Sequence, residues 1–204
     1  MIGFLQRYNV GTRLSAAFGL LILLSCGLVV AGLMTLAQAR ERMDSIVKRN
    51  MSFLTYTSEM RAASSAIAVQ LRNIVLPTTQ EENIGFAKII QEQRQRYDQA
   101  HDTLYAVPAS DAAGAEMRRR IDETREKARI VNQKVLDLGM NNQADAALKV
   151  LMQQAAPATQ NWQDAINAYA ERQRTRGATA YAAANVAMDK GRSMLIAGGV
   201  AVVI

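Results

Sequence analysis

Apolar residues fill one long stretch near the start of the chain and later recur at regular intervals. From Leu14 to Ala37 the chain has 24 consecutive uncharged residues, most of them Leu, Val, Ala, Gly or Ile. A helix of that length measures about 36 Å, which is enough to cross a hydrocarbon core of about 30 Å with some tilt. The pattern therefore predicts a transmembrane helix over residues 14–37.

A cleaved signal peptide is the alternative interpretation of this stretch. Arg7 and Arg13 could form its basic region, and residues 37–39 (Ala-Gln-Ala) resemble a cleavage site. Signal peptides have apolar cores of about 7–15 residues, so the longer run here favours an uncleaved anchor. Basic residues without acidic neighbours precede the run, and charges of both signs follow it. The positive-inside rule then places residues 1–13 in the cytoplasm and the chain after about residue 38 outside.

A second apolar segment occupies residues 193–204, and Lys190 and Arg192 precede it as basic residues do at a membrane interface. The segment is too short to cross a bilayer by itself. It predicts the start of a second transmembrane helix, which is cut short at residue 204. Residues 38–192 are then a domain between two spans.

A seven-residue apolar repeat follows the first apolar stretch, and such a repeat is typical of packed helices. Neither Gly nor Pro interrupts residues 38–76, so we expect this first helix of the domain to continue the transmembrane helix. The residues of the repeat are Ile46, Phe53, Met60, Ile67 and Ile74.

Turn and cap signals divide the rest of the domain. Pro77 ends the first helix, and Thr79 with Glu82 can form a capping box for a second helix over about 80–106. After Pro108, Ser110 or Asp111 can cap a third helix. The expected core-facing residues of the second helix are Ile90, Tyr97 and Leu104.

The third helix is predicted from an alternation of four- and three-residue steps, and it ends at Gly139 and Asn141-Asn142. Its expected core-facing residues are Met117, Ile121, Thr124, Ala128, Val131, Val135 and Leu138.

The fourth helical unit opens with a short helix over about 143–155 and is kinked near Pro157. A further four-three row then continues towards the second apolar segment. The whole chain is predicted to be all-α, an up-down-up-down four-helix bundle with helices 1 and 4 continuous with transmembrane helices. The residues of this last row are Trp162, Ile166, Tyr169, Gln173, Arg176, Ala180, Ala183 and Ala187.

Composition excludes several function classes. The net charge of +6 would suit nucleic acid, but Lys and Arg alternate with acidic residues along helical faces, so no nucleic-acid partner is expected. The single cysteine, Cys26, lies inside the apolar stretch and permits no intrachain disulfide. With His101 as its only histidine, the chain shows no catalytic constellation and no metal-ligand spacing. We expect no enzyme activity, no catalytic residues, no metal and no cofactor.

Three motifs carry a resemblance to a known family. Residues 10–14 (Val-Gly-Thr-Arg-Leu) with Phe18 resemble the N-terminal signature of methyl-accepting chemotaxis receptors. Residues 71–76 (Leu-Arg-Asn-Ile-Val-Leu) and 157–160 (Pro-Ala-Thr-Gln) are similar to motifs of the four-helix-bundle ligand-binding domain of these receptors, and the resemblance covers essentially the whole chain.

The resemblance implies a homodimeric chemoreceptor in the bacterial inner membrane. Residues 38–192 would be its periplasmic sensor domain, and a chemotaxis kinase and adaptor would be its cytoplasmic partners. The same sensor domain also occurs on histidine kinases and diguanylate cyclases, so these remain alternatives. Docking of a periplasmic binding protein and a tethered structural bundle without a ligand also remain open.

The resemblance also suggests a ligand site between the first and fourth helices, near their distal ends or across the dimer interface. In related aspartate receptors, an arginine matching Arg72 grips a ligand carboxylate, and a threonine matching Thr159 binds the backbone groups of the ligand. The companion arginines of those receptors fall near Ala63 and Ala68, so amino-acid specificity does not carry over. We expect instead a small carboxylate, either a di- or tricarboxylate or an aromatic acid.

Further candidate ligand-binding residues come from facing helices, where core packing or solvation is the alternative role of each. A guanidinium binds a carboxylate in bidentate fashion, and aromatic side chains can stack on a planar ligand. A basic excess also attracts anions. These further candidates are Tyr97, Arg129, Trp162 and Tyr169. On the first helix itself, Asn73 beside Arg72 is a candidate polar partner.

Overall fold

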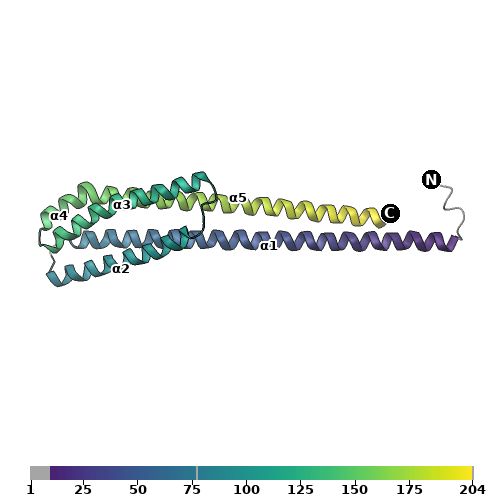
Figure 1. The fold of residues 1–204 in the computed structure, drawn as a ribbon, viewed down its shortest axis with the longest axis horizontal. Coiled ribbons are helices and arrows are strands. Elements are labelled where there is room, and N and C mark those ends of the chain that lie inside the picture. The colour runs from purple at the N-terminus through teal and green to yellow at the C-terminus, as the bar shows by residue number, and fades with distance from the viewer. Residues whose placement is uncertain (1–9, 77, 204) are drawn as a thin grey trace. The chain divides into compact units, whose positions relative to one another are not determined.

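The protein is all-α in a computed structural model that describes residues 10–76 and 78–203, and no strand occurs among these residues. The chain divides into two compact units, one of residues 49–176 and one formed by the two ends of the chain. The elements, labelled in Figure 1, are α1 (Val10–Asn73), α2 (Gln80–Tyr105), α3 (Ala112–Met140), α4 (Ala144–Val150), a π-helical turn η2 (Leu151–Ala155) and α5 (Ala156–Val203).

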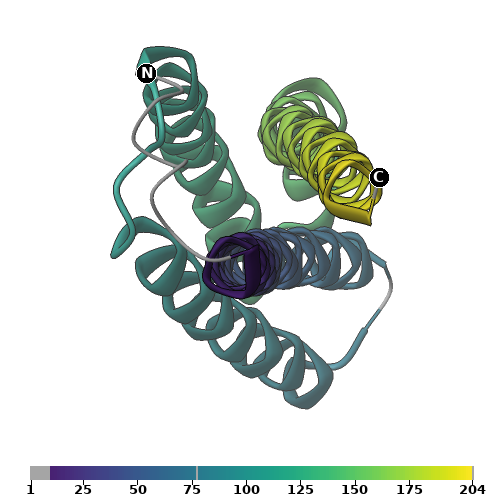
Figure 2. The same cartoon turned by 90° about the vertical axis from the view of Figure 1, so that its right-hand side faces the viewer.

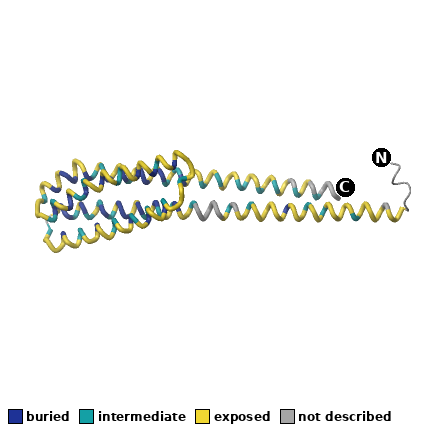
Figure 3. The backbone as a smooth tube through the Cα atoms, viewed as in Figure 1, coloured by how far each residue is buried: buried dark blue, intermediate teal, exposed yellow. Residues whose placement is uncertain are grey.

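Residues 49–176 form the predicted up-down-up-down four-helix bundle. The end of α1, then α2, α3 and the start of α5 run in alternating directions, as Figure 1 shows from the side and Figure 2 end-on. Buried residues concentrate where these helices pack (Figure 3). The largest fully buried side chains are Met60, Leu71, Ile74, Ile90, Tyr97, Leu104, Ile121, Val135, Ile166 and Tyr169.

The predicted helix starts are confirmed by their hydrogen bonds. At the start of α2, Thr79 Oγ1 accepts from the backbone N–H of Glu82 at 3.2 Å, and Glu82 Oε2 accepts from the backbone N–H of Thr79 at 2.7 Å. At the start of α3, the Asp111 carboxylate accepts from the backbone N–H of Gly114 at 2.7 Å. Each cap satisfies backbone donors that the first turn of a helix leaves free.

The end of α3 differs in detail from the predicted glycine stop. Gly139 lies inside the helix, and Asn142 is the residue with a left-handed backbone, at a φ of 56°. An ideal Cβ at Gly139 would lie 2.9 Å from Ile74 Cγ1 and 3.2 Å from the Ile74 carbonyl oxygen. The glycine therefore lets α3 approach the end of α1 closely, and asparagine tolerates the left-handed turn.

The predicted core-facing row of α3 is confirmed at Ile121, Ala128 and Val135, which are fully buried, whereas its other positions are shifted by one. Met117, Thr124, Val131 and Leu138 are only partly buried. The adjacent row turns further inward, with three members buried and Arg125 partly buried. Hydrogen bonds and an ion pair hold most of its polar atoms, although Arg118 Nη2 has no partner among the described residues. The members of this row are Arg118, Arg125, Asn132 and Gly139.

A π-helical turn precedes Pro157 where the sequence predicts a kink. Proline lacks an N–H and its ring clashes with the carbonyl four residues earlier, so a regular α-helix is disfavoured there. The turn η2 widens the backbone just before this position, and its residues Leu151 and Ala155 are buried. Such turns occur frequently at functional sites.

In the other unit, the segment Val10–Glu41 of α1 is the one stretch among the described residues that is long and apolar enough to cross a membrane. Its side chains are mostly exposed (Figure 3). Gly32 is buried there because Leu195 of α5 packs over it. Length and composition alone support a span. Residues 1–9 of the expected cytoplasmic N-terminus, and residue 204 with the side chains of 200–203 of the expected second span, lie outside the described part.

Candidate ligand-binding site

A pocket that is partly open to solvent lies between α1 and α5, beside η2. Arg72 is exposed on its wall and forms no hydrogen bond or ion pair with any side chain in the described part of the chain. Thr159 is only 4% exposed. The lining residues are Ala68, Leu71, Arg72, Asn132, Leu151, Ala155, Ala156, Thr159, Gln160 and Gln163.

Side-chain hydrogen bonds hold the walls of this α1–α5 pocket in place. Thr159 Oγ1 and the Asn132 amide exchange hydrogen bonds of 3.1 and 3.2 Å between α5 and α3. Gln163 Nε2 donates to Ser65 Oγ at 3.3 Å and connects α5 to α1. The pocket thus presents the Arg72 guanidinium and amide groups, which bind a carboxylate with polar substituents, whereas the Thr159 hydroxyl already donates its proton to Asn132.

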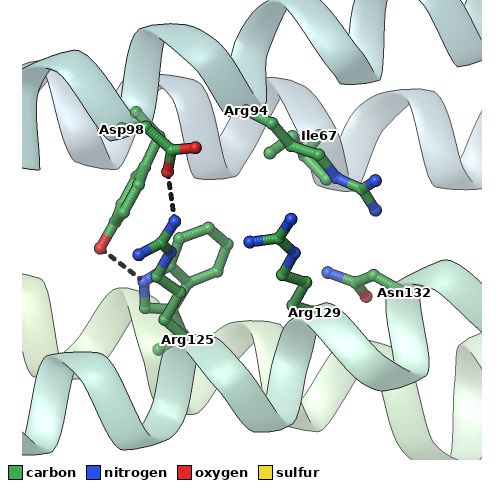
Figure 4. A pocket seen from close by; sticks show the side chains of 8 residues that line it. Ile67, Arg94, Asp98, Arg125, Arg129 and Asn132 are labelled. Carbon is green, nitrogen blue, oxygen red and sulfur yellow. Dashed lines mark hydrogen bonds and ion pairs between the residues drawn. The ribbon is translucent and has the colours of Figure 1, made fainter.

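A second pocket, also partly open to solvent, lies between α2 and α3 (Figure 4). In Figure 4, Arg94 of α2 and Arg129 of α3 extend towards the same space, with Asn132 beside them. The lining residues are Ile67, Arg94, Tyr97, Asp98, Arg125, Arg129, Asn132 and Trp162.

The arginines of this α2–α3 pocket differ in how they are neutralised. Arg125 forms an ion pair with Asp98, and its guanidinium carbon lies 4.9 Å from the Tyr97 ring centroid. Arg94 Nη1 donates to Gln133 Oε1 at 2.8 Å. Burial, and secondly the positive charge of Arg129, lower the pKa of Arg94. No carboxylate in the described residues forms an ion pair with Arg94 or Arg129.

Two aromatic side chains form the floor of the α2–α3 pocket. The Trp162 indole N–H donates to the Tyr97 hydroxyl at 3.1 Å, and the two rings meet edge to face with centroids 4.8 Å apart. Burial is the main cause that raises the pKa of Tyr97, so its hydroxyl remains protonated at neutral pH. The pair gives the pocket a rigid, uncharged base.

Tyr169 and Asn73 line neither pocket. Tyr169 is fully buried, and its hydroxyl accepts from Arg118 Nε at 3.0 Å. Arg118 is 7% exposed, also donates to the Val107 carbonyl at 2.7 Å, and lies over the Tyr105 ring at 4.9 Å. This cluster fixes the α2–α3 connection to α5, a packing role for Tyr169. The Asn73 amide donates to Gln70 Oε1 at 3.1 Å within α1.

The structure thus divides the predicted site residues between two places. Arg72 and Thr159 share the α1–α5 pocket, whereas Tyr97, Arg129 and Trp162 share the α2–α3 pocket.

Comparison with known proteins supports the interpretation of the bundle. A family described as a four helix bundle sensory module for signal transduction matches residues 7–188. The chain belongs to this family of methyl-accepting chemotaxis sensory modules. No curated protein and no solved structure matches the chain. The sensory module is therefore assigned by its family and its fold together.

Arg94 of the sensory module is not among the site residues predicted from the sequence. It lies on the same four-three row as Ile90, Tyr97 and Leu104. A charged residue at such a core-facing position indicates a candidate site residue, because burial of a charge needs a partner. His101 lies on this row too. Its ring nitrogens lie 2.9 Å from carboxylate oxygens of Asp102 and of Asp122 on α3. His101 therefore connects α2 to α3 rather than facing solvent alone.

Proposed function

We propose that the sensory module binds a small carboxylate in the α1–α5 pocket and passes the signal across the bacterial inner membrane to a chemotaxis signalling domain. The observation that carries this proposal is the guanidinium of Arg72, which has no partner among the described side chains and lies on the wall of a pocket that also contains Thr159. The ligand class is a di- or tricarboxylate of central metabolism or an aromatic acid.

The chemistry of the pocket supports an anion with further polar groups. A guanidinium binds a carboxylate through two parallel hydrogen bonds, and such charge-assisted bonds are roughly twice as strong as neutral ones. Gln160 and Gln163 add amide donors and acceptors on α5. A site with several polar groups suits a second carboxylate or a hydroxyl better than a bare apolar tail.

Both helices that form the pocket also contribute residues to the unit with the apolar segment, since α1 and α5 extend beyond residues 49–176. A ligand that binds more tightly to one arrangement of α1 and α5 therefore biases a signalling equilibrium. Couplings of this kind are typically about 1–3 kcal/mol. We place the bundle in the periplasm, with a homodimer as the signalling unit and a chemotaxis kinase and adaptor as cytoplasmic partners.

A thermal-shift screen of the full chain in detergent tests the proposal. The probes are succinate, malate, citrate and benzoate, each paired with its uncharged amide. A ligand at about 100 times its Kd stabilises the folded state by about 2.7 kcal/mol, so a binding acid raises Tm measurably. The amides should leave Tm unchanged, because they carry no negative charge and cannot form an ion pair with Arg72. If no acid raises Tm while a periplasmic binding protein is captured by the chain, the carboxylate proposal is wrong.

A further inference from the structure

The α2–α3 pocket carries more positive charge than its own acids neutralise. Three guanidiniums line it, those of Arg94, Arg125 and Arg129, against the single carboxylate of Asp98. Asp98 is already paired with Arg125. Asp137 acts on Arg94 only at longer range, and its carboxylate accepts from Gln133 at 2.7 Å. Arg94 and Arg129 therefore face the same space with no ion-pair partner among the described residues, an arrangement that costs free energy unless an anion joins them.

A buried donor points to the same conclusion. Arg94 Nη2 is buried and has no hydrogen-bond partner among the residues that the structure describes, although Nη1 is bound to Gln133. Buried guanidinium nitrogens in proteins are nearly always satisfied. Arg129 is exposed and Arg94 is partly buried, so an anion entering between α2 and α3 meets one accessible guanidinium and the buried Nη2 of a second (Figure 4).

The base of the pocket is apolar. Ile67 is 3% exposed, Tyr97 is 1% exposed and Trp162 is 4% exposed. The Trp162 indole N–H is bound to the Tyr97 hydroxyl, so Trp162 offers no free donor to a polar ligand. The pocket therefore combines a cationic rim with a hydrophobic floor, which fits an amphipathic anion better than a highly hydroxylated one.

We propose that the α2–α3 pocket is a second binding site, which takes a monocarboxylate on a small apolar body. The carboxylate bridges Arg94 and Arg129, and the apolar body packs on Ile67 and Trp162. This site lies within one copy of the chain and does not use Arg72. Asn132 lines both pockets, so ligands at the two sites share one wall.

Trp162 supplies a direct readout, because it is the only tryptophan of the chain and lines this pocket. The experiment titrates the full chain in detergent with cyclohexanecarboxylate and follows the tryptophan emission. The expected result is a saturable change that cyclohexylmethanol, the uncharged analogue, does not produce. Sulfate, which lacks an apolar body, should bind at least tenfold more weakly. The titration extends to about 10 mM, ten times a weak Kd of about 1 mM.

Arg129→Ala tests the cationic rim without disturbing the core, since this side chain is exposed and forms no ion pair in the described part of the chain. The loss of one charged hydrogen-bonding group should weaken binding about ten- to hundredfold. Arg120→Ala on the same helix, also exposed, is the matched control and should bind as the wild type does. Arg72→Ala should leave this titration unchanged, which separates the second site from the α1–α5 pocket.

Four results would overturn the proposal. They are an absence of any saturable response to the acid, an equal response to the alcohol, binding of sulfate as tight as that of the acid, or wild-type affinity in Arg129→Ala. Arg129→Ala should retain the helical circular-dichroism spectrum and the apo Tm of the wild type, or a slightly higher Tm, because it removes repulsion from Arg94. A loss of the fold in this variant would contradict the exposed, unpaired state assigned to Arg129.

Discussion

Asn132 and Thr159 exchange two buried hydrogen bonds between α3 and α5, at 3.1 and 3.2 Å, on the wall that separates the two pockets. Asn132 is 2% exposed and Thr159 is 4% exposed, so water cannot readily replace either partner. The pair fixes the relative position of two helices at the point where both candidate sites meet.

Thr159→Val should therefore destabilise the bundle by about 1–3 kcal/mol, because it leaves the buried Asn132 amide without its partner. Thr103→Val on α2 is the control, since that hydroxyl is exposed and bonds only to its own helix, at the Gln99 carbonyl. Adding Asn132→Leu to Thr159→Val should restore part of the loss, because no unpaired polar group then remains. Urea unfolding followed by circular dichroism measures these differences, and strictly additive costs would contradict the account.

The second prediction concerns the stability of a variant at Gly139, where α3 approaches the end of α1 closely. Gly139→Ala should destabilise the bundle by about 1–3 kcal/mol, because the new methyl group would lie 2.9 Å from Ile74 Cγ1. Alanine ordinarily stabilises a helix relative to glycine by about 1 kcal/mol. Gly85→Ala in α2 isolates that ordinary gain, since no atom lies within 4 Å of its ideal Cβ. Opposite signs for the two variants in thermal unfolding are expected, and stabilisation by both would show that Gly139 is not a packing site.

The third prediction concerns how the stabilising contribution of Asp111 depends on pH. Its pKa is lowered chiefly by the hydrogen bond from Arg172, and also by the Gly114 backbone N–H and the charge of Arg176. A carboxyl group whose pKa is lower in the folded than in the unfolded state stabilises the fold at pH values above its ordinary pKa, which is near 3.8 for Asp111. That contribution is lost as the pH falls through the lower folded pKa.

Asp111→Asn should accordingly be less stable than the wild type at pH 7, and the difference should shrink towards zero as the pH falls below about 4. Asp145→Asn is the matched control, because Asp145 is exposed in the first turn of α4 and accepts no side-chain hydrogen bond among the described residues. Urea unfolding across this pH range gives the comparison. A stability difference that stays constant with pH would contradict the assigned role of the Asp111 charge.

The helices and their caps could be predicted from the sequence because local chemistry decides them. Thr79 and Glu82 form the expected capping box, and the apolar repeat through Met60 and Ile67 is buried as predicted. Ile121, Ala128 and Val135 of α3 are buried as predicted, but the burial of Asn132 could not be predicted, because hydrophobicity favours Leu138 over Asn132 as a core residue. Only the three-dimensional structure shows that Thr159 satisfies the Asn132 amide and so allows it to be buried.

The candidate site was predictable where a motif carried it and unpredictable where distant helices create it. Arg72 and Thr159 were expected together from family motifs, and the structure places both in one pocket. Arg94 and Arg129 lie far apart in sequence on different helices. The sequence predicts Arg129 as a candidate ligand-binding residue, but no pattern in it pairs Arg129 with Arg94. Their shared pocket depends on the register between α2 and α3, which single-helix periodicity does not define.

Isothermal titration calorimetry of the full chain tests most directly whether the α1–α5 pocket is a carboxylate receptor. The titrant is the acid of the panel that raises Tm most, and the proteins are wild type, Arg72→Ala and the matched control Arg61→Ala, an exposed arginine on the same helix. Saturable binding to wild type and to Arg61→Ala is expected, with about ten- to hundredfold weaker binding to Arg72→Ala. Equal affinity of all three proteins, or an absence of binding heat with the wild type, would contradict the assignment.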